Sequence, residues 1–182
     1  MGLPNIIIEF KTKASTAIKR GERGVVAVMV IEKSNHGVTK IEDKTQVPAD
    51  LTAANKEYVE RAFEGGKAPI KHVLLIRTDT VENALAKLET IKFDYLAAPQ
   101  KIATQIKTMR DSKRMKVKAV LPNIAADHEG IINFTTGDIV VGDKTYTAGQ
   151  YCSRIAGILA GTPLNVSSTY FVLGEVDDVP KF

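Results

Sequence analysis

Tryptophan is absent from the 182-residue chain, cysteine occurs once and histidine three times. A single cysteine excludes a disulfide framework and a thiolate metal cluster, and it is typical of a reducing compartment. No stretch approaches the roughly 18 apolar residues of a membrane-spanning helix, and the first residues lack the pattern of a secretion signal. We therefore expect no membrane insertion, and a cytoplasmic protein at the time of synthesis.

Aromatic residues are also scarce, at 6%, and they are not interleaved with basic residues as in a surface that stacks single-stranded nucleic acid. The formal net charge is only +4, from 25 basic and 21 acidic residues. The densest basic group, Lys113, Arg114, Lys116 and Lys118, is typical of a helix end followed by the start of a strand. We therefore expect no direct contact with nucleic acid.

Motifs that bind cofactors or activate a serine are missing as well. No G-x-G-x-x-G segment follows the first buried strand, which argues against a dinucleotide site. Gly66-Lys67 lacks the surrounding residues of a phosphate-binding loop. No serine lies in a Gly-x-Ser-x-Gly elbow. The sequence thus predicts no cofactor.

The residues that look most catalytic are the neighbours Asp127, His128 and Glu129. Metal ligands on a helix are three or four positions apart so that they share a face, whereas consecutive residues project in different directions. We interpret this group as a turn or helix cap that bonds to its own backbone, and we predict no metal site.

Cys152 offers a second catalytic role, with His128 as base and Asp127 as the orienting group. It lies in a helical segment whose Tyr151 and Ile155 are spaced for burial, and a lone cysteine there is usually a small core residue. We predict no catalytic residue. An α/β hydrolase that uses His128 or Cys152 is the alternative.

From residue 24 to Pro122, buried strands alternate with helices. Apolar runs of strand length suit strands that are covered on both faces, and the segments between them have helical spacing. Strands are expected at 24–31, 71–77, 93–99 and 115–122, and helices at 51–63, 81–90 and 101–114, with Asp50 or Thr52 and then Thr80 as N-caps. This alternation predicts an α/β fold with a mostly parallel sheet flanked by helices.

After Pro122 the pattern changes to short strands. GIINF, GDIVV and KTYTA each have strand length, and Gly142-Asp143 between the last two indicates a β-hairpin insertion. A helix over 149–161 begins at Thr147 or Ala148, and a last strand is expected over 168–173.

The chain opens with GLPNIIIEF, which carries a single charge. Ile6, Ile8 and Phe10 share one face of a period of two, so residues 3–11 read as an extended, half-buried strand. An unpaired apolar strand is an aggregation hazard and needs a partner. The pattern leaves open whether that partner is an edge of the same sheet or another molecule. Residues 12–23 are polar and predict a tether.

Three segments resemble the contractile tail sheath proteins of phages and prophages of Gram-positive bacteria. They are the opening GLPNIIIEFKTKASTAIKRGERG, KVKAVLPNIAADHEGIINF (Lys116–Phe134) and YCSRIAGILAGTPLNVSSTY (Tyr151–Tyr170). The last two are the most specific, because neither composition nor fold requires Ala-Asp-His-Glu-Gly or Ala-Gly-Thr-Pro-Leu-Asn.

The resemblance implies a structural subunit that polymerises helically around an inner tail tube and contracts to drive the tube through a cell envelope. The expected partners are neighbouring sheath subunits, the inner tail tube protein and the baseplate. Assembly in the bacterial cytoplasm would be followed by a place in a virion or in a phage-tail-like bacteriocin. The family's core is of the subtilisin-like type, but a protease triad is not identifiable in this sequence.

The resemblance also implies an N-terminal arm that pairs as a strand with a neighbouring subunit. The residues that match this linking strand are Asn5, Ile6, Ile7, Ile8, Glu9 and Phe10. The chain then divides into a linking arm and tether over 1–23 and an α/β sheath domain over 24–182. Sheath proteins of this family continue beyond the point that matches GEVDDVPKF, so we expect the domain to be truncated at its C-terminus.

Overall fold

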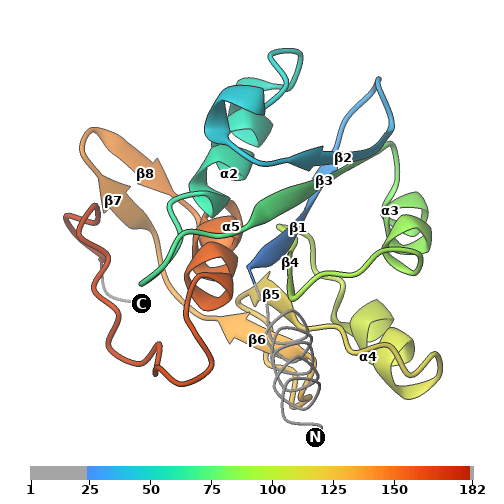
Figure 1. Cartoon of the computed structure of the whole chain (residues 1–182). Coiled ribbons are helices and arrows are strands. Elements are labelled where there is room, and N and C mark those ends of the chain that lie inside the picture. The colour runs from blue at the N-terminus through green and yellow to red at the C-terminus, as the bar shows by residue number, and fades with distance from the viewer. Residues whose placement is uncertain (1–23, 181–182) are drawn as a thin grey trace, which may run out of the picture.

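A computed structural model describes residues 24–180, in which six strands form one sheet and two more form a hairpin. The strands of the large sheet are β1 (Val25–Ile31), β2 (Gly37–Ile41), β3 (His72–Thr78), β4 (Tyr95–Ala97), β5 (Ala119–Pro122) and β6 (Ile131–Phe134). Their spatial order is β2-β3-β1-β4-β5-β6, as Figure 1 shows. Every neighbouring pair is parallel except β2 with β3. The predicted mostly parallel α/β fold is confirmed.

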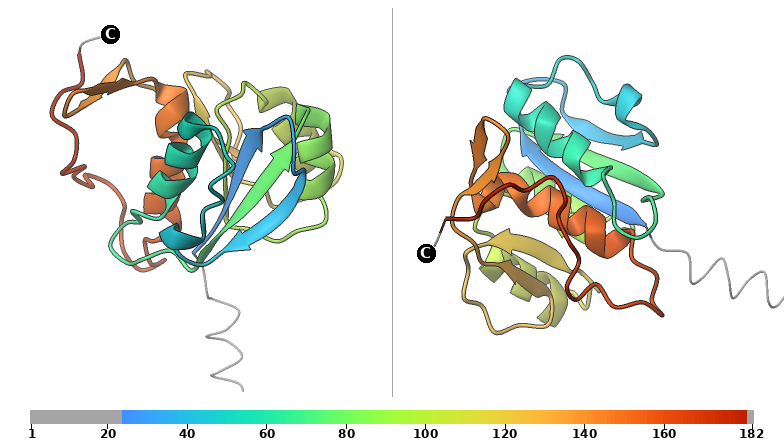
Figure 2. Two further views of the ribbon diagram at one scale, coloured as in Figure 1. Left: turned by 90° about the horizontal axis from the view of Figure 1, so that it is seen from above. Right: turned by 90° about the vertical axis from the view of Figure 1, so that its left-hand side faces the viewer.

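Helices cover both faces of the large sheet (Figures 1 and 2). The helices are α2 (Ala53–Ala62), α3 (Val81–Leu88), α4 (Ala103–Asp111) and α5 (Ala148–Ala160), with a short 3₁₀ turn at Lys44–Gln46. α2 and α5 lie together on one face, and α3 and α4 lie on the other. The hydrophobic core is therefore split into two layers by the sheet.

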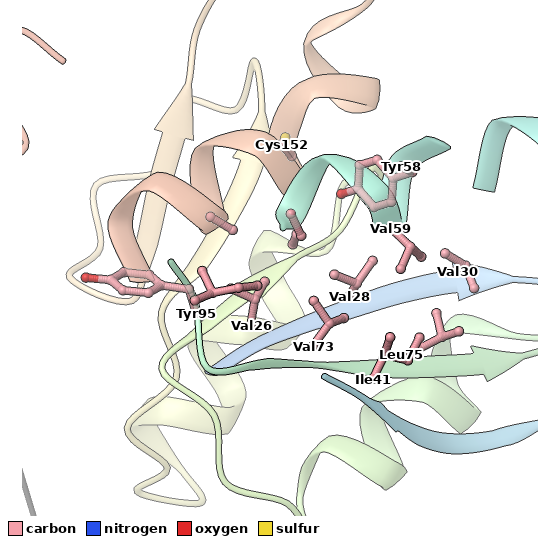
Figure 3. Close-up of a cluster of buried hydrophobic side chains, with 14 of the residues drawn as sticks. Val26, Val28, Val30, Ile41, Tyr58, Val59, Val73, Leu75, Tyr95 and Cys152 are labelled. Atoms are coloured by element: carbon pink, nitrogen blue, oxygen red, sulfur yellow. The ribbon is translucent and has the colours of Figure 1, made fainter. Parts of the chain in front are cut away.

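β1 is the central strand, and its side chains supply both core layers. Val26, Val28 and Val30 belong to the cluster under α2 and α5, which Figure 3 shows together with Tyr58 and Tyr95. Ala27 and Met29 alternate with them and belong to the cluster under α3 and α4. All five are 0–1% exposed. The continuous apolar run from residue 24 to 31 is thus explained by burial on both faces.

Side-chain caps begin two of the helices where the sequence predicts them. The Thr80 hydroxyl accepts the N–H of Asn83 at the start of α3. Thr147 forms a capping box with Gln150 at the start of α5. Of the two alternatives for α2, Thr52 is the cap residue, whereas Asp50 forms a two-pronged ion pair with Arg77 on β3.

The predicted hairpin is confirmed as β7 (Ile139–Val141) and β8 (Lys144–Tyr146). Gly142 at its turn has a φ of +57°, a conformation that glycine adopts at little cost. The hairpin lies at one end of the molecule, beside the N-terminal end of α5 (Figure 1).

Two features differ from the sequence expectations. The segment 168–173 is not a strand: Tyr170 has a φ of +56° within a turn, so the alternation of its side chains does not produce an extended ladder. The strand in GIINF exists, but as β6 it joins the large sheet parallel to β5 after a connection of only residues 123–130. Periodicity alone did not identify that partner.

α5 packs unusually close to α2 because of a glycine. A Cβ at Gly157 would lie 2.3 Å from the carbonyl oxygen of Ala62, the last residue of α2. Two further glycines, Gly66 and Gly161, are confined by backbone atoms where the segment after α2 passes the same, C-terminal end of α5. At these positions backbone segments approach each other without side chains between them.

We predict that Gly157→Ala lowers the free energy of unfolding by about 1–3 kcal/mol, because the added methyl group forces α5 away from α2. Gly149→Ala is the matched control in the same helix. Its Cβ meets its nearest neighbour at 3.5 Å, so unchanged or slightly higher stability is expected. Urea unfolding followed by circular dichroism measures both, and equal stability of the two variants would contradict the prediction.

Candidate functional site

The predicted linking strand, Asn5 to Phe10, and the tether that follows it lie outside the described residues. The structure begins at Gly24, so what it defines is the position at which such an arm joins the domain. We call Gly24, Val25 and Asp94 the arm root.

The carboxylate of Asp94 holds the arm root at the centre of the sheet. Its Oδ2 accepts the backbone N–H groups of Gly24 at 2.8 Å and of Val25 at 2.9 Å. The backbone N–H of Asp94 in turn donates to the carbonyl oxygen of Val25 at 2.9 Å. Asp94 immediately precedes β4, so these three bonds fix the first residues of β1 to its neighbour on one side.

Gly24 is fixed on its other side by the segment that leads into β3. Its carbonyl oxygen accepts the N–H of Lys71 at 2.7 Å. Its φ is +116°, and an added Cβ would lie 2.9 Å from the backbone nitrogen of Lys71. A side chain is therefore excluded here by both conformation and space. The sequence shows that a glycine, Gly24, precedes the apolar run. No sequence pattern near Gly24 predicts that it contacts Asp94, which is 70 positions away.

We predict that Asp94→Ala lowers the free energy of unfolding by about 1–3 kcal/mol, since two N–H groups lose their acceptor. Asp94→Asn retains one carbonyl oxygen and should fall between Ala and the parent chain. Hydrogen exchange at the amides of Gly24 and Val25 should accelerate in the same order.

The control for these variants is Asp127→Ala, at an exposed aspartate, where a change within about 0.5 kcal/mol is expected. Unaltered exchange at Gly24 and Val25 in Asp94→Ala would show that other groups hold the arm root.

A second surface is formed by the β7–β8 hairpin and residues 162–180, which we call the strap. Figure 2 shows the strap passing across α5. Leu173 and Val176 of the strap pack against Tyr146 and Tyr151. Backbone hydrogen bonds of 2.9 Å join Val140 of β7 to the strap's residues 177 and 178. The strap therefore extends the hairpin as a third extended segment.

Arg154 of α5 is the buried cation that holds the strap. Its Nε lies 2.6 Å from an oxygen of Glu175 and 3.0 Å from one of Glu64, and its Nη1 donates to the carbonyl oxygen of Gly65. Tyr151 adds a 3.1 Å hydrogen bond to Glu175. Burial opposes the ionisation of Glu175, but the hydrogen bonds from Arg154, Tyr151 and the backbone, together with the charge of Arg154, outweigh burial and hold the pKa of Glu175 below its usual value. An ion pair this enclosed resists solvent screening.

Arg61 of α2 holds the hairpin in the same manner. Its guanidinium lies 3.5 Å from the ring centroid of Tyr146 and donates to Glu57 at 3.0 Å. Glu57 also accepts the hydroxyl of Tyr146 at 2.6 Å and the ammonium of Lys144 at 3.2 Å. Burial works against the charge on Glu57, yet these donors keep its pKa below the usual value. The hairpin is thus attached to α2 by charge and by aromatic contact.

Asp127, His128 and Glu129 do not converge. The Nδ1 of His128 accepts the N–H of Gly130 at 3.1 Å, and its Nε2 lies 3.3 Å from Asp111. Glu129 pairs instead with Arg110. The interpretation of this group as a turn that bonds to its own backbone is confirmed.

Cys152 is enclosed by the core layer under α2 and α5, where Figure 3 shows it near Tyr58. Its thiol donates to the carbonyl oxygen of Ala148 at 3.3 Å. Burial raises its pKa to about 12, so the thiolate that a nucleophile needs does not form near neutral pH. Cys152 is a core residue, as the sequence indicated.

We predict that Cys152 reacts with a thiol reagent at pH 8 only when the domain opens. Labelling should therefore be slow in buffer and should accelerate with urea in step with unfolding. Complete labelling within seconds of mixing in buffer would contradict this assignment.

Neither metal ligands nor a membrane helix is found among residues 24–180. No three His, Cys, Asp or Glu side chains in that range come together as ligands. No helix there is both long and apolar enough to cross a bilayer.

The described domain consists of a core that the sheet divides into two layers, a fixed arm root, and a hairpin and strap attached by buried cations. The sequence profile of the phage tail sheath protein central domain matches residues 76–181, which is more than half of the chain. The chain belongs to the phage tail sheath protein family.

Individual relatives agree with this assignment. The tail sheath protein of Clostridium phage phiCD119 is 36% identical, and the match covers 99% of this chain and 54% of that protein. The phage-like element PBSX protein XkdK of Bacillus subtilis is 36% identical over 47% of this chain and 20% of its own length. The chain thus spans about half the length, or less, of these relatives.

Solved structures show the same fold. The sheath tail protein of Desulfitobacterium hafniense superposes with a TM-score of 0.71 at 19% identity, covering 89% of this chain and 65% of that one. The sheath tail protein of Listeria innocua gives 0.69 at 16% identity, with 87% and 61% covered. Tail sheath proteins are structural components of phage particles, so this chain is not an enzyme, and the hydrolase alternative at His128 or Cys152 is wrong.

Proposed function

We propose that this chain is the arm and core domain of a contractile sheath subunit that polymerises helically around an inner tail tube. On contraction the assembly would drive the tube through a cell envelope. The match of residues 76–181 to the tail sheath family carries this proposal. The neighbouring sheath subunits, the tube protein and the baseplate are its partners. Assembly would occur in the bacterial cytoplasm, and the mature place would be a virion or a phage-tail-like bacteriocin.

The division of the chain supports a linking role for its first residues. Residues 1–23 would act as arm and tether, and residues 24–182 as part of the sheath domain. The polar stretch 12–23 can span up to roughly 40 Å at about 3.3–3.6 Å per residue. Asn5 to Phe10 would then add as a strand to a neighbouring subunit, with backbone hydrogen bonds giving affinity and alternate side chains giving register.

The arm root, which lies within the described residues, also supports a linking role for the arm. Asp94 and the backbone of Lys71 fix Gly24 between two strands. An arm that begins there keeps a defined starting point while its far end changes position. Contraction would take its energy from subunit packing, and a requirement for added ATP or GTP would contradict this.

Electron microscopy of negatively stained protein tests the assembly directly. The protein at full gene length is compared with residues 1–182. Long hollow tubes from the full-length protein support the proposal. Small particles of fixed size from both, over a range of salt concentrations, would instead indicate an adaptor that binds one partner and would reject a sheath.

We predict that Ile8→Asp, Phe10→Asp or deletion of residues 1–11 prevents tube formation by the full-length protein. Each places a charge on the face of the linking strand that is expected to be buried, at a cost of several kcal/mol. Ile7→Asp alters the opposite face and serves as the matched control, with a smaller loss expected.

Circular dichroism should show an intact α/β core in all of these variants, since both large hydrophobic clusters are supplied by residues within 24–180. Normal tubes from both Ile8→Asp and Phe10→Asp would show that residues 5–10 do not link the subunits.

A further inference from the structure

The segment between α4 and β5 carries basic side chains on one side only. Met115 is half-buried and Val117 is 2% exposed, whereas Arg114, Lys116 and Lys118 alternate with them and face solvent. The nearby Lys113 is paired with Glu89. Within residues 24–180, the other three cations form no ion pair. We call Arg114, Lys116 and Lys118 the basic strip.

The strap presents apolar side chains to solvent. Tyr170 is 96% exposed, Val172 is 81% exposed and Val179 is 44% exposed. Their neighbours Leu173 and Val176 turn the other way and pack on the hairpin. A segment that is anchored on one side and apolar on the other is typical of a surface that another protein covers.

Exposed carboxylates lie on the hairpin and on the end of the strap that is hydrogen-bonded to it. The exposed acidic residues of the hairpin and strap are Asp138, Asp143, Asp177 and Asp178. The basic residues at this surface that the structure describes are Arg61, Lys144 and Arg154, and they are paired with Glu57, Glu64 and Glu175. Among residues 24–180, the hairpin–strap surface therefore combines uncovered apolar groups with exposed carboxylates that form no ion pair.

The two surfaces adjoin different layers of the domain. Met115 and Val117, which alternate with the basic strip, pack in the cluster under α3 and α4. The strap packs on the hairpin and is paired with Arg154 of α5, on the face of the sheet that carries α2 and α5 (Figures 1 and 2). Each surface carries exposed charges of one sign, so two copies of the same surface repel each other. A contact between them would be head-to-tail, which is the type of contact that repeats into rings or open helices.

We propose that the basic strip of one copy docks against the hairpin–strap surface of a second copy. Opposite charges would steer and orient the encounter, and the exposed ring of Tyr170 would supply the desolvated anchor. This inference rests on the proposed sheath function and adds a contact between the globular domains to the one made by the arm.

Charge reversal at each of the two surfaces tests the contact in the 182-residue chain. In the first variant, Arg114→Glu, Lys116→Glu and Lys118→Glu make the basic strip acidic, so both surfaces are acidic. In the second, Asp138→Lys, Asp143→Lys and Asp178→Lys make the hairpin–strap surface basic, so both surfaces are basic. Sedimentation velocity is measured at about 0.01 M salt, where the Debye length is about 30 Å, and at about 1 M, where it is about 3 Å.

The parent chain should self-associate in low salt and lose this association in high salt. Each reversed variant alone should associate at least tenfold more weakly. An equimolar mixture of the two variants should associate again, because the acidic surfaces of the first variant can contact the basic surfaces of the second. A parent chain that stays monomeric at about 1 mM in low salt, or a mixture that stays monomeric, overturns the proposal.

Tyr170→Ser tests the apolar part of the surface, and Val38→Ser on β2, also at an exposed residue, is its control. Weaker association is expected from the first alone. An unchanged association in Tyr170→Ser would mean that something else covers the strap, such as further chain of the same subunit, and would overturn the docking site.

The same reversals in the full-length protein separate this inference from the proposed function. Normal tubes from both reversed variants would reject the docking contact and leave the sheath function standing. An absence of tubes from the parent full-length protein would reject the sheath function itself.

Discussion

The close approach of α5 to α2 is the constraint on which the rest of the described structure depends. Gly157 allows it, because any side chain there would overlap the carbonyl group of Ala62. The approach brings the end of α2 beneath the hairpin, where Arg61 lies over Tyr146. It also places Arg154 against the Gly65 carbonyl group and within reach of the strap. Both attachments are made where these two helices meet.

The two attachments give the outer parts of the domain a fixed position without a large core of their own. The hairpin cluster is small, with Ile139, Tyr146 and Tyr151 as its buried members. Buried ion pairs add little net stability but are costly to break singly, because the remaining charge is left without a partner. Arg61 and Arg154 therefore specify where the hairpin and strap lie more than they stabilise the fold.

Local patterns were sufficient to predict most of the large sheet and its helices. A few neighbouring residues were enough to predict each of these features: the apolar run of β1, the caps at Thr80 and Thr147, and the turn at Gly142. The prediction of a strand over 168–173 is wrong: Tyr170 has a positive φ within a turn, and Tyr170 and Val172 face solvent. Alternation indicates a strand only where one face has a partner.

The arm root and the attachment of the strap were harder to predict from the sequence, because the residues that form them are far apart in the chain. Asp94 acts on Gly24 across 70 positions, and Arg154 reaches Glu175 across 21. No spacing rule connects such pairs before the sheet order is known. Residues 1–23 could be interpreted through pattern and resemblance alone, which is why the linking strand remains a proposal.

The position of β1 has a mechanical consequence. A strand at the edge of a sheet can be peeled away one hydrogen bond at a time, whereas β1 is held by parallel ladders to β3 and β4 at once. A force applied at Gly24 would have to break both ladders and draw side chains out of two core layers together. The domain is thus suited to bear tension at Gly24, because the ladders to β3 and β4 resist a pull together.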